Sequence, residues 1–209
     1  EFGIDIAVTH ALFENDPCVQ LLVAAKAEMD SAEVAAEIKR ASSLDPLTGI
    51  YNRVYMTNAF GQAIRDASEK DKFSSLHIIS IDLYEEMRSS LGASGRDAAM
   101  VDIAKYLRET IGSNGILGKI SDDEFALLAN GTDEEQQTKI AQDLCKKISS
   151  HICQAASKTV QLTASIGICP ITEKITSPDQ ILDRAHTACE EVRAAGKNGT
   201  GNDARYYTA

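Results

Sequence analysis

The sequence GKISDDEFALLAN, residues 118–130, decides the fold. An apolar segment ends at Ile120, four polar residues follow, and a second apolar segment begins at Phe125. Two short apolar segments joined by a polar turn predict a β-hairpin. Acidic side chains at a hairpin tip can hold a metal ion, or they can simply be solvated. The rest of the chain has to distinguish between these alternatives.

Composition narrows the class of protein. The 209 residues are 44% hydrophobic and carry a net charge of −10, which allows a core domain of about 150 residues with additional segments. No apolar run approaches the roughly 20 residues of a membrane span. The acidic balance argues against nucleic acid or an anionic membrane as a partner. Five scattered cysteines without a C-x-x-C motif indicate free thiols, and we expect a cytoplasmic location.

The N-terminal part predicts two elements outside the main domain. Residues 1–25 alternate as two strands around the turn ENDP and predict a β-hairpin. Residues 26–44 are Ala-rich and predict a helix. This helix is either a coiled-coil connector between domains or an amphipathic helix that lies on its own domain, because its apolar stripe is too short to choose.

The remaining chain alternates helices and strands. We expect a helix at 53–69 capped by Asn52, and a helix from the N-cap Ser177 to Gly196. Further elements are a buried strand at 75–82 that contains His77, a helix at 94–111, the hairpin, a helix at 133–153 and a strand at 160–169. This order predicts an α/β (α+β) sandwich with a central antiparallel sheet flanked by helices, not a doubly wound parallel sheet.

Six motifs occur in an order and spacing typical of one family. They are DPLTGIYNR (45–53), SIDLY (80–84), LGASGRD (91–97), SDDEF (121–125), TASIGI (163–168) and AAGKN (194–198). Together they resemble GGDEF domains, the diguanylate cyclases that join two GTP molecules into cyclic di-GMP, over residues 45–203. The resemblance implies a palm-like antiparallel sheet and a polymerase-like phosphoryl transfer in which two metal ions stabilise charge.

The resemblance also implies where the nucleotide-site residues fall. The metal-binding Asp of the family's strand falls on Ser80, whereas the next acid is kept as Asp82. The family's phosphate-side Lys has become Glu85, and its guanine-binding Asn has become Arg88. The second guanine contact is kept as Asp97.

The hairpin departs from the family in the same direction. The family's two glycines, which let the backbone approach the nucleotide, are replaced by Ser121 and Asp122. The hairpin acids are kept as Asp123 and Glu124. Two basic residues that can meet phosphates remain as Arg193 and Lys197. The family's inhibitory RxxD site falls on residues 112–115, which contain neither Arg nor Asp.

These substitutions predict a nucleotide site that has lost its catalytic activity. A carboxylate about 4 Å from a phosphate charge adds repulsion of roughly 1 kcal/mol in water and several near a protein surface, so Glu85 and Asp122 oppose a triphosphate. We expect no catalytic residue, no bound metal, and weak or absent binding of Mg and GTP. Three functions remain: an inactive regulatory and interaction module, a GTP-binding allosteric domain without turnover, and an active cyclase with unusual metal ligation.

The N-terminal hairpin adds a prediction about the whole protein. It resembles the last two strands of a PAS domain, and the arrangement resembles FimX-type PAS-GGDEF-EAL regulators of type IV pili. We therefore expect a protein partner in signalling or pilus machinery and, at 204–209, the start of a linker to an EAL domain. Unpaired strand edges seek partners, so a homodimer through residues 1–44 is a further expectation.

Overall fold

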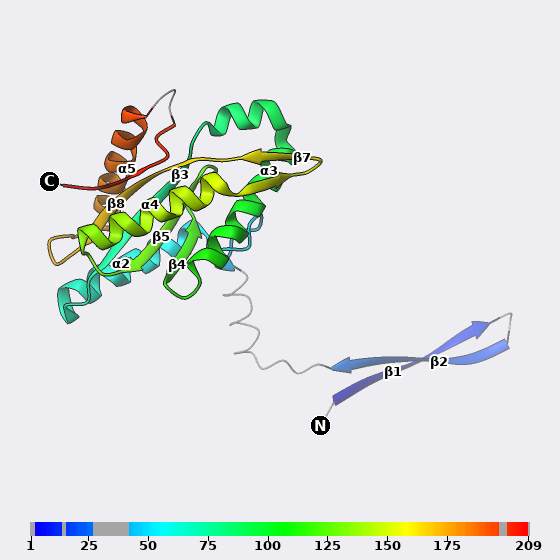
Figure 1. The fold of residues 1–209 in the computed structure, drawn as a ribbon. Coiled ribbons are helices and arrows are strands. Elements are labelled where there is room, and N and C mark those ends of the chain that lie inside the picture. Colours follow the sequence, from blue (N-terminus) through cyan, green and yellow to red (C-terminus); the bar gives the residue numbers. More distant parts are fainter. Residues whose placement is uncertain (1–2, 14–15, 27–41, 197–199, 209) are drawn as a thin grey trace. The chain divides into compact units, whose positions relative to one another are not determined.

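A computed structural model describes residues 3–13, 16–26, 42–196 and 200–208 (Figure 1). The chain divides into two compact units, Glu1–Ser42 and Ser43–Ala209. In the first unit, β1 (Gly3–Phe13) pairs antiparallel with β2 (Asp16–Lys26). The expected N-terminal hairpin is confirmed, while its PAS parentage remains a prediction. The helix expected at 26–44 lies almost entirely outside the described residues.

The second unit is a five-stranded sheet with helices on both faces (Figure 1). The sheet order is β4-β5-β3-β8-β9, antiparallel except for the parallel pair β8–β9. The predicted fold class is confirmed. The elements are α2 (Arg53–Lys70), β3 (Ser74–Ile81), α3 (Tyr84–Ile111), β4 (Gly115–Lys119), β5 (Glu124–Asn130), α4 (Glu134–Ser150), β6 (Ile152–Ala155), β7 (Lys158–Gln161), β8 (Ala164–Ile171), α5 (Pro178–Ala195) and β9 (Ala204–Tyr206).

The central strand β3 separates two apolar cores. Leu76 and Ile78 pack in the core made with α2 and α5, whereas Ile79 and Ile81 pack in the core made with α3 and α4. Every residue of β3 is buried, as the sequence predicts for a strand covered on both faces. Side chains alternate along a strand, so Ser80 shares the α2 and α5 face with Ile78.

The turn that opens the domain follows from its residue types. The Asp45 carboxylate Oδ1 accepts hydrogen bonds from the Thr48 amide at 2.9 Å and the Thr48 hydroxyl at 2.6 Å. Gly49 has φ +69°, which a glycine adopts without strain. The expected cap of α2 is confirmed, because Asn52 Oδ1 accepts from the Tyr55 amide at 3.0 Å.

Three expected element bounds are wrong. The helix expected at 94–111 begins at Tyr84, with a break at Gly92 (φ 70°) that the merged element α3 contains. The helix expected at 133–153 ends at Ser150, because the next residues extend into the β6–β7 hairpin. The strand expected at 160–169 is divided into two: β7 ends at Gln161, and β8 begins at Ala164.

The C-terminal boundary also differs from expectation. Residues 204–206 form β9, which pairs in parallel with β8 at Ile166–Ile168. The domain therefore extends beyond residue 203, and these residues are part of the sheet rather than a linker. Tyr206 packs against the α3 and α4 core, and its hydroxyl donates to the Thr132 carbonyl at 2.7 Å.

The structure also describes His77, four of the cysteines and the length of the helices. His77 lies within the strand expected to be buried; it is fully buried, and its Nε2 donates to Gln137 Oε1 at 2.9 Å. The four cysteines whose side chains are described, at 145, 153, 169 and 189, are free and buried. Among the described residues, no helix combines the length and apolar character needed to cross a membrane.

Candidate functional site

Part of the expected nucleotide site lies where β3, β5 and β8 run side by side next to the hairpin tip. Ser80 on β3 is paired in register with Glu124 on β5 and with Ser165 on β8. The Ile81 amide donates to the Asp123 carbonyl at 2.9 Å and fixes the tip beside the end of β3. We call the three cross-strand residues Glu124, Ser80 and Ser165 the site row. Ser80 and Ser165 are fully buried.

The hairpin acids are held by a hydroxyl of their own turn. The Ser121 hydroxyl is 2.9 Å from Asp123 Oδ1 and 3.2 Å from Glu124 Oε2, so it is shared between the two carboxylates. The Glu124 carbonyl closes the turn by accepting from the Ile120 amide at 3.0 Å. Asp122 at the tip is exposed. The turn thus fixes Asp123 and Glu124 but leaves Asp122 in solvent.

Asp82 is a buried carboxylate satisfied by the neighbouring strand. Its side chain is fully shielded from solvent. It accepts from the Thr163 hydroxyl at 2.8 Å, the Ser165 hydroxyl at 2.7 Å and the Asn202 amide at 3.4 Å. Because these donors come from the start of β8 and the segment before β9, Asp82 ties together the ends of three chain segments.

A guanidinium lies at the site row. Arg193, in the last turn of α5, donates from Nη2 to Ser80 Oγ, and its Nε is 3.8 Å from Asp82 Oδ1. Its charge also contributes to lowering the pKa of Glu124. One cation therefore binds Ser80 and lies close to Asp82, two of the expected nucleotide-site positions.

The close packing of α5 on β8 makes this contact possible. A Cβ atom at Gly167 would overlap the Ala185 carbonyl and the backbone amide of Cys189. Only a glycine lets the helix backbone approach the strand this closely. Gly167 thereby sets the distance at which Arg193 reaches Ser80.

A second side chain of α5 pairs with the hairpin. His186 Nε2 is 3.3 Å from Glu124 Oε2. The hydrogen bond and charge of Glu124 raise the pKa of His186 although burial alone would lower it. Burial alone would raise the pKa of Glu124, but the His186 and Ser121 hydrogen bonds and the nearby positive charges lower it overall. The pair is therefore an ion pair at mildly acidic pH.

Comparison with known families assigns most of the chain. Residues 42–199 match the family described as "Diguanylate cyclase, GGDEF domain". The chain belongs to the GGDEF domain family. Its hairpin reads SDDEF at 121–125, so two of the five positions that give the family its name differ.

Relatives and solved structures agree with this assignment. This GGDEF domain is 28% identical over 193 residues to the oxygen sensor protein DosP of Escherichia coli K12, covering 92% of this chain and 23% of DosP. It is 27% identical over 169 residues to the diguanylate cyclase TpbB of Pseudomonas aeruginosa, covering 77% and 38%. The chain thus spans less than two fifths of each of these relatives.

Two structures illustrate the likeness of fold. The FimX GGDEF domain of Pseudomonas aeruginosa has a TM-score of 0.71 and 29% identity, covering 78% of this chain and 98% of that one. The coiled coil and GGDEF domain of DgcB from Caulobacter crescentus has a TM-score of 0.75 and 17% identity, covering 84% and 91%. The second likeness supports the fold alone.

The outer positions of the expected nucleotide site form salt bridges within α3. Asp97 forms a salt bridge with Arg96 at 2.6 Å, and Glu85 forms one with Arg88 at 3.2 Å. Glu85 and Arg88 are mostly exposed. Lys197, expected at the phosphate side, lies outside the described residues.

Sequence reasoning missed the inward contacts of α5. His186 and Arg193 are seven residues apart, and two helical turns place them on one face of the helix. That spacing was a usable signal, but the identity of their partners depends on the strand register. Sequence reasoning also missed the cluster of Asp102, His151 and Cys153. Asp102 is about 50 positions from the other two residues, and no local sequence pattern connects them.

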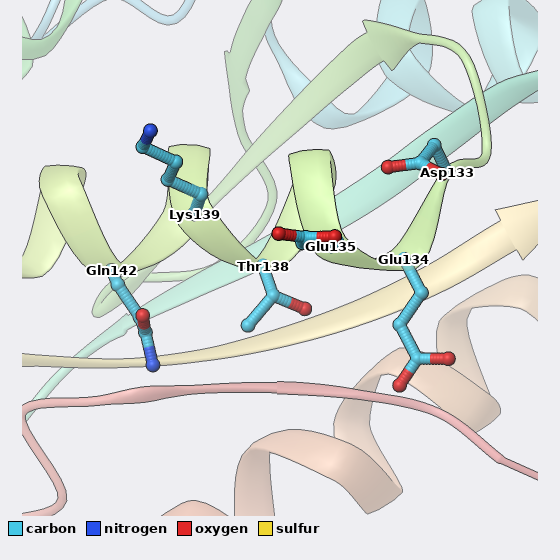
Figure 2. Close-up of a pocket in the computed structure, with 6 residues that line it drawn as sticks. All are labelled: Asp133, Glu134, Glu135, Thr138, Lys139 and Gln142. Carbon is cyan, nitrogen blue, oxygen red and sulfur yellow. The ribbon is translucent and has the colours of Figure 1, made fainter.

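A separate hollow of about 670 Å³ lies along the outer face of α4 (Figure 2). It is lined by Asp133, Glu134, Glu135, Thr138, Lys139 and Gln142. Three of these residues are acids at the N-terminal end of the helix, where they stabilise the helix dipole. Its acidic lining disfavours a phosphate ligand, and it contains none of the expected nucleotide-site positions.

Proposed function

We propose that this GGDEF domain is a catalytically inactive regulatory and interaction module in cyclic di-GMP signalling. The observation that carries the proposal is the contact between the Arg193 guanidinium and Ser80. The family holds a metal ion with a carboxylate at the position of Ser80. Here that position has a neutral hydroxyl bound to a cation. The domain therefore has the fold of a cyclase without this metal ligand.

The side chains present do not fit a magnesium ion. Magnesium prefers near-octahedral oxygen ligands that include one or two carboxylates. Asp82 is 3.8 Å from Arg193 and accepts bonds from Thr163 and Ser165, and Asp123 is bound to Ser121. A divalent ion about 4 Å from a guanidinium meets repulsion of several kcal/mol at an effective dielectric constant near 20.

The outer charges support the same proposal. Glu85 and the exposed Asp122 add negative charge near the expected triphosphate position, and the overall charge of −10 does not attract polyphosphates. Asp97, the retained guanine contact, forms a salt bridge with Arg96. A nucleotide would have to compete with this ion pair.

A GTP-binding domain without turnover is the second candidate. It is favoured by two retained positions, Asp97 and Arg193, which the family resemblance assigns to guanine and phosphate. It is opposed by their present engagement with Arg96 and Ser80. An active cyclase with unusual metal ligation is the third candidate, and no contact in the described residues favours it.

We extend the proposal to the whole protein by analogy. The likeness to the FimX GGDEF domain and the N-terminal hairpin support a cytoplasmic FimX-type regulator of type IV pili with PAS and EAL domains. A protein partner in signalling or pilus machinery would supply the output. The solved structure of the diguanylate cyclase SiaD in complex with its activator SiaC from Pseudomonas aeruginosa illustrates such an association for that protein. A homodimer through residues 1–44 remains part of this proposal, and light scattering on a chain lacking residues 1–30 tests it.

Product formation tests the central proposal. The parent chain and a Ser80→Asp, Asp122→Gly variant are incubated with GTP and Mg at high protein concentration, and nucleotides are separated by chromatography. We expect no cyclic di-GMP from the parent. Product from the parent that disappears in Asp123→Asn would establish the third candidate, whereas a thermal shift with Mg–GTP but no product would establish the second.

A further inference from the structure

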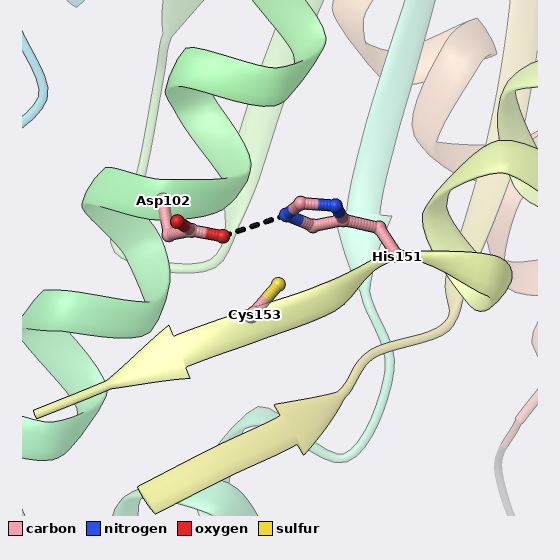
Figure 3. Close-up of side chains that lie close together, drawn as sticks. All are labelled: Asp102, His151 and Cys153. Atoms are coloured by element: carbon pink, nitrogen blue, oxygen red, sulfur yellow. Dashed lines mark hydrogen bonds and ion pairs between the residues drawn. The ribbon is translucent and has the colours of Figure 1, made fainter. Parts of the chain in front are cut away.

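A second group of metal-ligating side chains lies away from the site row. Asp102 on α3, and His151 and Cys153 at β6, place one ligand atom each within 4.8 Å of the others. His151 Nε2 is 2.6 Å from Asp102 Oδ2. Figure 3 shows the Cys153 sulfur beside this pair and directed toward it.

The local folds explain why the three side chains converge. His151 ends α4 with extended backbone angles and leads directly into β6. In extended chain, residues two apart face the same side, so His151 and Cys153 both face α3 while Ile152 between them is 56% exposed. β6 packs against α3, and Cys153 belongs to the same core as that helix.

The ligand set indicates a class of metal. A thiol sulfur, an imidazole nitrogen and a carboxylate oxygen suit zinc and similar thiophilic divalent ions, whereas magnesium and calcium prefer oxygen ligands alone. Bonds of about 2.0–2.3 Å in a tetrahedral site separate ligand atoms by roughly 3.3–3.8 Å. Small side-chain rotations from the present spacing would reach that geometry.

The surroundings leave the site reachable and oriented. The side chains of Asp102 and His151 are 26% and 23% exposed, so solvent can supply a fourth ligand. Tyr106 stacks on the His151 ring with centroids 4.0 Å apart and planes 9° apart, which restrains the ring. On binding, the Cys153 thiol would release its proton to solvent as the metal–sulfur bond forms.

We propose that Asp102, His151 and Cys153 bind Zn²⁺, or another thiophilic divalent cation, with water as the fourth ligand. The bound ion would join the β6–β7 hairpin to α3. This proposal does not depend on the fate of the nucleotide site.

Cobalt(II) titration of the chelator-treated chain tests the site, because a thiolate–cobalt bond gives a charge-transfer band that oxygen and nitrogen ligands do not give. We expect one cobalt ion per chain with this band, displaced by Zn²⁺, and a rise in Tm with Zn²⁺. Cys153→Ser should abolish the band. His151→Gln and Asp102→Asn should each weaken cobalt binding by more than about 100-fold. Loss of a side chain that only hydrogen-bonds to a metal ligand would have a smaller effect.

Matched controls locate the metal. His186→Gln and Cys189→Ser alter another histidine and buried cysteine, three residues apart on α5, and should leave the band unchanged. Circular dichroism establishes that each variant is folded, and Asp102→Asn tests the site if Cys153→Ser is not folded. The proposal is overturned if the parent shows no band, if the band survives Cys153→Ser or His151→Gln, or if either control removes it.

Discussion

Replacing Arg193 by Gln tests the internal cation most sharply. The substitution keeps a long polar side chain but removes the charge that lies 3.8 Å from the buried carboxylate of Asp82. The Asp82 carboxylate would then keep its Thr163 and Ser165 hydroxyl donors at 2.8 and 2.7 Å but lose its ion pair with Arg193. We therefore expect a loss of stability.

The size of the loss follows from the geometry. Two unit charges about 4 Å apart interact by about 4 kcal/mol at an effective dielectric constant of 20. The Arg193 side chain is 34% exposed, so solvent screens part of this, and we expect a loss of about 1–3 kcal/mol. The surface pair Arg205–Glu191 is closer, at 2.8 Å, but both side chains are 52% exposed. Its disruption should cost less than about 1 kcal/mol, since burial outweighs distance.

Urea denaturation of the parent, Arg193→Gln and the control Arg205→Gln measures this difference. Arg193→Gln should lower the free energy of unfolding clearly more than Arg205→Gln, and its Tm by roughly 2–4 °C for each kcal/mol. A double-mutant cycle with Asp82→Asn should give a coupling energy of about 1 kcal/mol or more. Equal stability of Arg193→Gln and the parent, or no coupling to Asp82, would refute the reasoning.

Three further predictions concern packing and pH. Gly167→Ala should destabilise the domain by about 1–3 kcal/mol or more, because its Cβ would overlap the Ala185 carbonyl; chemical denaturation checks this, and an unchanged midpoint contradicts it. The Glu124→Gln variant should lose most stability relative to the parent between pH 4.5 and 6.5, by up to about 1 kcal/mol. The pKa of His186 is raised from 6.5 and that of Glu124 lowered from 4.5, so the stabilisation declines above and below this window, and a pH-independent difference counts against the pair. Burial lowers the pKa of His77 to about 4, so the unfolded chain binds more protons than the folded chain below pH 6.5, and the free energy of unfolding falls by about 3 kcal/mol toward pH 4. The slope of the free energy of unfolding against pH should be smaller in His77→Gln. An equal slope in both proteins would show that another group is responsible.

Much of the fold could be predicted because its determinants are local. The caps Asn52 and Ser177 accept the expected amide hydrogen bonds, and the strand expected at 75–82 is buried along its whole length as β3. The errors fall where tertiary contacts decide. The apolar residues after Ser150 suit a helix or a strand equally, and packing against α3 favours β6.

The candidate site was predictable in position but not in arrangement. Family motifs place Ser80 and Asp123 in the sequence, and the structure brings them together through the β3–β5 register. The contact of Arg193 with Ser80 depends on helix placement, which Gly167 sets through a backbone approach. Such an approach, between Gly167 and the helix backbone at Ala185 and Cys189, leaves no periodic pattern in the chain.

Calorimetric titration of Mg–GTP into the chain tests the central claim most directly, because binding to one domain does not require a cyclase dimer. If the Arg193 cation takes the place of the metal at Ser80, the parent should give no saturable heat. Saturable heat that requires Mg and disappears in Asp123→Asn would contradict the account.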